Sequence, residues 1–137
     1  MNPLIIILRL FIAFACGAII GLEREISDKA AGLRTHILVC LGACLYGIIG
    51  LTLAAGYKAD ILRLAQGLLI GIGFLGGGVI FREGPSVKGL TTAAGIWIMG
   101  AIGLAAGIGN YYVAAIGTVF TFLTLSVFSK IEGWVKK

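Results

Sequence analysis

The charged side chains of two short segments are the residues of this chain that could do chemistry. Acidic and basic groups alternate in them, so they could pair with one another or hold a charged partner. The first segment contributes Glu23, Arg24, Glu25, Arg34 and Thr35, and the second contributes Arg82 and Glu83. No nucleophile stands beside a general base in either segment. We therefore expect a structural or protein-binding role and no enzymatic activity.

A second set of polar side chains could line a path for an ion. Arg63 and Gln66 are three residues apart, as are Asp60 and Arg63, so all three lie on one side of a helix. Arg63 and Gln66 would form the outer mouth of the path. The inner mouth would be formed by Arg34, Glu83, Thr91 and Thr92. Ion-coupled carriers usually place an acidic residue inside the membrane. No Asp or Glu lies in the middle of an apolar segment here, so transport is the alternative interpretation.

Three potential metal ligands recur at four-residue spacing, namely His36, Cys40 and Cys44. They could hold a soft metal ion, but no fourth ligand is evident. We favour an interfacial histidine and two small apolar cysteines. The glycines at 76–78 lack the Lys-Ser/Thr ending of a phosphate loop, so we expect neither metal nor cofactor. Arg9, near the end of an apolar segment, is expected to snorkel outward.

Apolar segments make up most of the chain that carries these groups. Of its 137 residues, 59% are hydrophobic and 12% are charged, whereas about 25% are charged in an ordinary soluble domain. A spanning helix needs about 20 mostly apolar residues. Five segments qualify as membrane helices, which predicts one all-α polytopic domain over residues 1–137: Leu4–Leu22, His36–Ala55, Ile61–Phe81, Gly89–Gly107 and Tyr111–Phe128.

The basic residues indicate how the helices cross the membrane. Eight of the eleven lie in the connections and tail that share one side, namely Arg24, Lys29, Arg34, Arg82, Lys88, Lys130, Lys136 and Lys137, while Lys58 lies on the other. The positive-inside rule then places the N-terminus outside and the C-terminus inside. Because no basic face with interleaved aromatics exists, we expect no nucleic-acid partner. Pro85 predicts a turn at 82–88.

Glycine is far more common than average, with 22 residues in 137 against a typical usage of about 7%. Pairs at four-residue spacing let helix backbones approach closely in lipid. We expect these pairs to pack helices within the chain, with a homo-oligomer interface as the alternative: Gly17 and Gly21, Gly67 and Gly71, Gly73 and Gly77, and Gly103 and Gly107. The glycines between 71 and 78 could also unwind a helix, but we favour close packing.

These motifs together resemble the MgtC/SapB family of bacterial inner-membrane proteins. The resemblance covers almost the whole chain, in several separated blocks in the same order. The blocks are Gly17–Glu25, Ala31–His36, Arg63, Gly71–Gly84, Gly89–Ala94 and Ala101–Gly107.

The resemblance implies a helical membrane protein linked to Mg²⁺ homeostasis. Better-known members of the family regulate other membrane proteins, including ATP synthase, and have a soluble C-terminal domain. This sequence ends at Lys137, so we expect the short, membrane-only type. Some members have Asn where this chain has Thr91, and a role of that Asn does not transfer. The leading hypothesis is a regulator acting by protein–protein contacts in the bilayer, and the alternative is an ion transporter or channel subunit.

Overall fold

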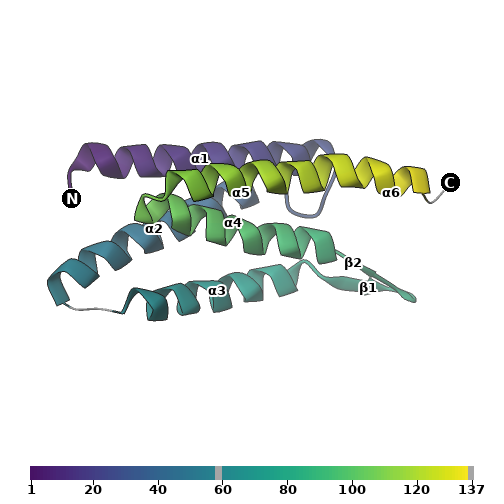
Figure 1. Ribbon diagram of the computed structural model, residues 1–137. Coiled ribbons are helices and arrows are strands. Elements are labelled where there is room, and N and C mark those ends of the chain that lie inside the picture. Colours follow the sequence, from purple (N-terminus) through teal and green to yellow (C-terminus); the bar gives the residue numbers. More distant parts are fainter. Residues whose placement is uncertain (58–59, 136–137) are drawn as a thin grey trace.

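The computed structural model describes residues 1–57 and 60–135, and the predicted all-helical architecture is confirmed (Figure 1). Lys58, Lys136 and Lys137, which entered the orientation prediction, lie outside the described residues. In chain order the elements are α1 (Pro3–Ile26), α2 (Leu33–Tyr57), α3 (Ile61–Gly78), β1 (Phe81–Glu83), β2 (Ser86–Lys88), α4 (Leu90–Ile108), α5 (Tyr111–Leu123), the π-helical segment η1 (Thr124–Phe128) and α6 (Ser129–Val135).

Four helical segments within the described residues are long and apolar enough to cross a membrane. They are α1, α2, α4 and the continuous run from α5 into α6. The helix α3 is apolar but shorter, with 18 residues. The chain is therefore a polytopic transmembrane helical bundle. The prediction that the third helix continues to Phe81 is wrong, because α3 ends at Gly78 and Phe81 begins a strand.

A β-hairpin interrupts the helices between α3 and α4. Glu83 pairs with Ser86, which leaves Gly84 and Pro85 as a two-residue turn. The φ of Gly84 is +60°, a value that glycine adopts without strain at the first position of such a turn. Proline suits the second position because its ring fixes φ near −65°. The turn predicted at 82–88 is confirmed, whereas its two short strands were not predicted.

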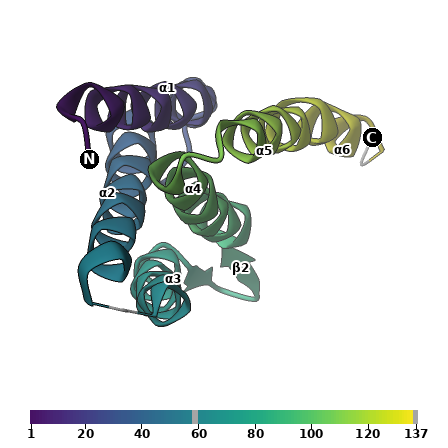
Figure 2. The same cartoon turned by 60° about the vertical axis from the view of Figure 1, so that its left-hand side comes forward.

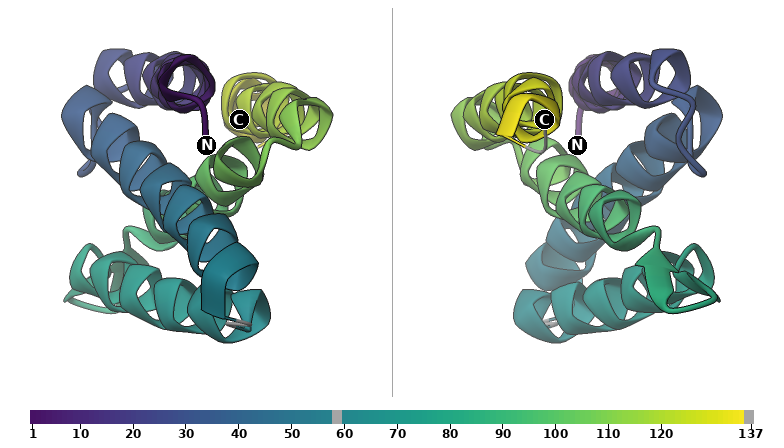
Figure 3. Two further views of the ribbon diagram at one scale, coloured as in Figure 1. Left: turned by 90° about the vertical axis from the view of Figure 1, so that its left-hand side faces the viewer. Right: turned by 90° about the vertical axis from the view of Figure 1, so that its right-hand side faces the viewer.

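The helix α4 is the centre of the bundle. It contacts α1, α2, α3 and α5, and a larger share of it is buried than of the other long segments. Figure 2 shows α1 and α5 on one side of α4 and α3 on the other. Figure 3 shows α2 crossing α4. The helix α3 lies below this crossing, on the side away from α1 and α5. A helix surrounded in this way needs small side chains wherever a neighbour comes close.

Glycines make the crossing of α4 with α2 possible. A Cβ atom on Gly103 would lie 2.9 Å from the carbonyl carbon of Cys40, and one on Gly107 would lie 2.9 Å from that of Cys44. Both contacts are with backbone, which cannot turn aside as a flexible side chain could. The α4 backbone therefore rests directly on α2, as small residues at four-residue spacing permit in membranes.

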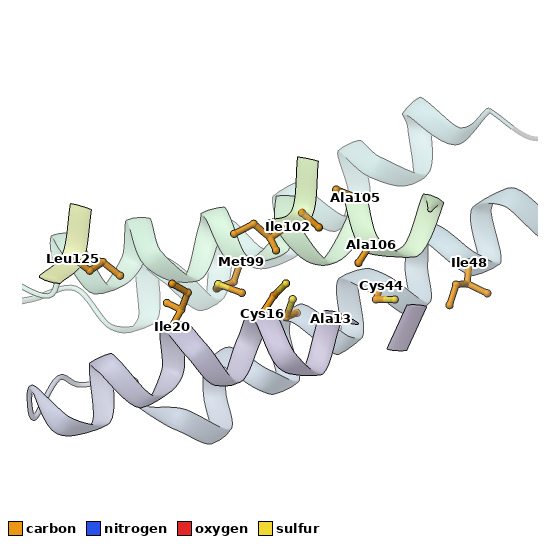
Figure 4. Packing of buried hydrophobic residues seen from close by; sticks show 12 residues of the cluster. Ala13, Cys16, Ile20, Cys44, Ile48, Met99, Ile102, Ala105, Ala106 and Leu125 are labelled. Atoms are coloured by element: carbon orange, nitrogen blue, oxygen red, sulfur yellow. The ribbon is translucent and has the colours of Figure 1, made fainter. Parts of the chain in front are cut away.

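The helix α1 approaches α2 by the same device. A Cβ atom on Gly17 or on Gly21 would lie 2.8 Å from a Cα atom of α2, that of Ile37 or of Leu33 respectively. The side chains left between α1, α2, α4 and α5 form the main core (Figure 4). It includes Ala13, Cys16, Ile20, Cys40, Cys44, Met99, Ile102 and Ala106.

The two glycine pairs of α3 differ from this pattern. Apart from the local backbone of α3, no described atom lies within 4 Å of the place that a Cβ would occupy at Gly67, Gly71, Gly73 or Gly77. The expectation that these pairs pack helices within the chain is therefore not met. The sequence left open whether the glycine-rich end of this helix is continuous, and the structure shows α3 as α-helix through Gly78.

Arg9 binds the protein itself. Its Nη1 atom donates a hydrogen bond of 2.7 Å to the carbonyl oxygen of Gly107, near the end of α4. Carbonyls at a helix C-terminus have no partner within the helix, and a cation there is also favoured by the helix dipole. Arg9 therefore joins α1 to α4, whereas the sequence had suggested that it snorkels outward.

The packing predicts opposite outcomes for equivalent glycine substitutions. Gly103→Ala should destabilise the protein by about 1–3 kcal/mol, because the new methyl group meets backbone that cannot yield. Gly73→Ala should be neutral or stabilising by up to about 1 kcal/mol, because alanine favours helix and the site is open. Unfolding of both variants in detergent, followed by circular dichroism, measures the difference. Equal destabilisation would contradict the different surroundings of the two glycines.

The Arg9 contact predicts a second stability effect. Arg9→Met keeps an apolar side chain of similar length but removes the donor to Gly107, and should cost about 1–3 kcal/mol of unfolding free energy. Arg63→Met is the matched control, since Arg63 is exposed on α3 and its loss should change stability by less than about 0.5 kcal/mol. The same denaturation assay compares the two. A larger loss for the control would refute the assigned role of Arg9.

Candidate functional site

A cavity of about 680 Å³ opens where the first charged segment, the hairpin and the start of α4 come together. The end of α1, the β-hairpin and α6 lie toward the same end of the molecule in Figure 1. The π-helical segment η1 forms the remaining wall. The polar residues lining the cavity are Arg24, Asp28, Lys29, Lys88, Thr91, Thr92, Thr124 and Ser129.

Arg24 is the most buried charged residue of this site, with 3% of its surface exposed. Its Nε atom forms an ion pair with the carboxylate of Glu23. Its Nη2 atom approaches the carbonyl oxygen of Leu125 in η1 at 3.5 Å. The other oxygen of Glu23 accepts a hydrogen bond of 3.0 Å from the hydroxyl of Ser27. Arg24 thereby links the end of α1 to the wall formed by η1.

Glu25 has a different task from its neighbours. Its Oε2 atom accepts a 2.8 Å hydrogen bond from the backbone N–H of Leu33, the first residue of α2. A side chain on Gly32 would occupy the space of this carboxylate. Glu25 belongs to α1 and caps the start of α2. The dipole of α2 favours a negative charge at this end of the helix. Arg34 and Thr35 follow on the exposed side of α2 and do not line the cavity.

The second charged segment pairs within itself. Arg82 donates a hydrogen bond of 2.9 Å from Nε to the carbonyl oxygen of Gly84, and Glu83 forms an ion pair with Lys88. Both contacts stiffen the hairpin. The two ion pairs found among the described residues thus lie within single segments, Glu23 with Arg24 and Glu83 with Lys88. Among the residues that the structure describes, no ion pair joins the two segments, contrary to the pairing that the sequence suggested.

The residues proposed for a polar path are not brought together. Thr91 and Thr92 line the cavity, at the start of α4. Arg63 and Gln66 are exposed near the start of α3, at the opposite end of the bundle in Figure 1, and do not line that cavity. Asp60 caps α3, because its Oδ1 atom accepts a 2.9 Å hydrogen bond from the N–H of Leu62.

His36 is a buried side chain in the first turn of α2. It is fully buried, and its Nδ1 lies 2.9 Å from the carbonyl oxygen of Gly32, so that Nδ1 donates. Its Nε2 faces Gly95 and has no hydrogen-bond partner in the part of the chain that the structure describes. Cys40 and Cys44 are buried on the same side of α2. No three His, Cys, Asp or Glu residues among those described could hold a metal ion.

Sequence reasoning missed several residues of the cavity. Lys29 and Lys88 were counted only toward membrane orientation, although each lies close in sequence to a charged motif. Thr124 and Ser129 belong to the last helical segment, which gave no signal of contact with the first segment. The hydroxyls could have suggested a polar end of that helix, but only the fold shows what they face.

Comparisons with known proteins agree on one family. The sequence profile of the MgtC family matches residues 10–134. The chain is 41% identical to the "Putative magnesium transporter YhiD" of Escherichia coli K12, over 91% of this chain and 61% of that protein. It is 39% identical to the protein SrpB of Synechococcus elongatus, over 94% of this chain and 79% of that protein. It is 44% identical to the protein MgtC of Brucella abortus, over 79% of this chain and 44% of that protein.

The chain thus spans less than two thirds of the length of the Escherichia coli and Brucella relatives. No solved structure matches it. The profile match over nearly all of the chain, together with relatives of about 40% identity, establishes that this membrane protein belongs to the MgtC family.

Proposed function

We propose that this chain is a bacterial inner-membrane protein that regulates Mg²⁺ homeostasis through helix–helix contacts with other proteins in the bilayer. The observation that carries the proposal is the face of α3 that no other part of the described structure covers. A helix in a membrane bundle that packs on one side only leaves its other side to lipid or to a partner. The residues on that side indicate whether it contacts lipid or a partner protein.

The packed side of α3 is well defined. Leu68 and Ile72 are buried there, and a side chain on Gly100 of α4 would overlap Ile72. Gly76 continues this side, since a Cβ atom on it would lie 3.7 Å from the Cβ of Ala93. These contacts fix the rotation of α3 about its own axis. The residues one half-turn away must therefore face outward.

The outward side of α3 combines large apolar side chains with glycines. Ile70 is 75% exposed and Phe74 is 84% exposed. Gly73 and Gly77 lie beside them, with no described neighbour close to either. Projecting side chains next to small residues form the ridges and hollows by which helices pack closely in lipid. A face made only of large apolar side chains would instead favour contact with lipid.

Polar side chains extend the same face toward the start of α3. Arg63 and Gln66 precede Ile70 and Phe74 at spacings of three and four residues, so all four share one side of the helix. Side chains of this kind form hydrogen bonds between helices in membranes. They could select a partner helix that offers an acceptor at the same depth.

The name of one relative supports the link to magnesium. The Escherichia coli relative is named for magnesium transport. That name also favours a second candidate function, in which this chain is itself an ion transporter or a channel subunit. The two proposals differ in whether the isolated chain moves ions.

The α3 face predicts the effect of filling its hollows. The double variant Gly73→Ile and Gly77→Ile should abolish crosslinking from a photoreactive residue at position 74 to a partner in native membranes, because the added side chains hold the helices apart. The variant should still fold, since both sites are open and isoleucine is a better helix former than glycine. Immunoblotting of the crosslinked products measures the result.

A matched control separates this effect from added bulk. Ala115→Ile adds a side chain at an exposed position of α5 and should leave the crosslinks intact. Crosslinks that survive in the α3 double variant would contradict the proposal. A product of twice the mass of this chain would instead identify the homo-oligomer alternative.

A flux assay tests the second candidate. The purified chain in proteoliposomes should move neither Mg²⁺ nor K⁺ faster than empty vesicles do, because a regulator has no path of its own. Selective, saturable flux that is lost in Arg63→Ala and Gln66→Ala variants that still fold would overturn the regulatory proposal and establish transport.

A further inference from the structure

We propose that His36 is a proton-sensitive switch, in which proton binding at its Nε2 atom loosens the contact of α1 and α4 with α2. The inference needs neither the open face of α3 nor ion transport, so it stands apart from the function proposed above. Three observations carry it: the complete burial of the imidazole, a ring nitrogen without a partner, and the close helix contacts on both sides of the residue.

His36 lies where three helices meet. On the side of α1, a Cβ atom on Gly17 would lie 3.0 Å from the carbonyl oxygen of His36, and one on Gly21 would lie 3.2 Å from its Cβ atom. On the side of α4, a Cβ atom on Gly95 would lie 3.6 Å from its Nε2 atom. None of the surface of His36 is exposed. A change in the charge of the ring therefore acts on the contacts of all three helices.

The surroundings of the ring define the tautomer of the neutral imidazole. Nδ1 lies 2.9 Å from the carbonyl oxygen of Gly32. A carbonyl oxygen can only accept, so Nδ1 carries the proton and Nε2 has a free lone pair. No described residue forms a hydrogen bond with Nε2. The core tolerates the neutral ring because a buried uncharged acceptor costs far less than a buried charge.

Proton binding changes both the charge and the hydrogen bonding of this ring. The imidazolium has an N–H donor at each nitrogen. The new donor at Nε2 would point toward Gly95, which has no side chain to accept a hydrogen bond. A buried charge is tolerated only where it is paired and hydrogen-bonded. Movement of α1 or α4 away from α2 would let water reach Nε2, so protonation favours a looser bundle.

The charged groups around the ring do not supply the missing partner. Arg24 and Glu23 of α1 interact with the imidazole, but they form an ion pair with each other, so their effects on a nearby cation oppose one another. Glu25 of α1 caps the start of α2, and Arg34 of α2 is exposed. The helix α4 contains no titratable residue. Two thiols of the core complete the set and are uncharged below about pH 7: Cys16 and Cys40.

The pH range of the switch follows from the chemistry of an exposed histidine. In water a histidine binds its proton near about pH 6.5, and unfolding frees His36 to do so. Proton binding then favours the unfolded chain, so stability is complete above this pH and is lost as the pH falls through it. With one proton involved, the folding equilibrium constant should fall by about tenfold between about pH 7 and about pH 5.5.

Unfolding of the purified whole chain tests this expectation. Titration of detergent micelles with sodium dodecyl sulfate, followed by circular dichroism, measures the equilibrium at both ends of that pH range. His36 is the one histidine of the chain, and carboxylates titrate near about pH 4, so other side chains contribute little. The natural chain should show the tenfold loss, and His36→Leu, which binds no proton, should show none. A natural chain with constant stability, or an equal loss in the variant, would overturn the proposal.

Substitutions at Gly95 test the role of Nε2 itself. Gly95→Ser places a hydroxyl beside Nε2 that can accept a hydrogen bond from the imidazolium. The variant should lose most of the pH dependence, because a hydrogen bond to a charged group contributes about tenfold or more to an equilibrium constant. Gly95→Ala is the matched control, since it fills the same space without a hydroxyl and should keep the dependence. Equal pH dependence in the two variants would refute the assignment to Nε2.

Nuclear magnetic resonance of the natural chain keeps the proposal testable if His36→Leu does not fold. Isotope-labelled histidine reports on a single imidazole, because the chain has one histidine. At neutral pH the folded chain should show the neutral ring with its proton on Nδ1. On acidification, the imidazolium signal should appear together with the loss of folded signals. A protonated ring in a chain that stays fully folded would overturn the switch. These assays contain no partner protein, so their failure would leave the α3 proposal untouched.

Discussion

The contact of two glycines of α4 with the backbone of α2 is the constraint on which the rest of the structure depends. Gly103 and Gly107 lie against the carbonyl groups of Cys40 and Cys44, with no room for a side chain between them. Lipid offers no hydrophobic driving force for two apolar helices to associate, so close backbone approach and van der Waals contact must hold them. This crossing makes α4 the central helix, and the other helices pack around α4.

The position of α4 brings irregular elements together at one end of the bundle. The hairpin precedes α4 and ends at a glycine with positive φ, and η1 interrupts the last helix with a π-helical segment. A π-helical segment such as η1 is frequent at functional sites. Here the irregular backbone surrounds a cavity that also contains the buried Arg24.

The sequence left two roles open for the charged motifs, a structural one and a protein-binding one. The fold shows which of these residues stabilise the structure. Glu25 caps α2, and Arg82 stiffens the hairpin, so these residues hold the chain in shape. Arg24 is also paired, yet it lines a cavity. Spacing along the chain predicted that the charges lie at helix ends. It could not predict that each ion pair would form within its own segment, because that depends on how far apart the segments are held.

The sequence by itself determined the membrane class, the five apolar helical segments and the turn around Pro85. The membrane class and the helices follow from composition, because only long runs of apolar residues can span the lipid. The tertiary structure decided what each glycine pair does. Gly17 with Gly21 and Gly73 with Gly77 have the same spacing, yet the first pair contacts α2 and the second faces outward. The physical reason is that helical periodicity fixes which residues share a face, whereas only the packing of the whole bundle determines what lies opposite that face.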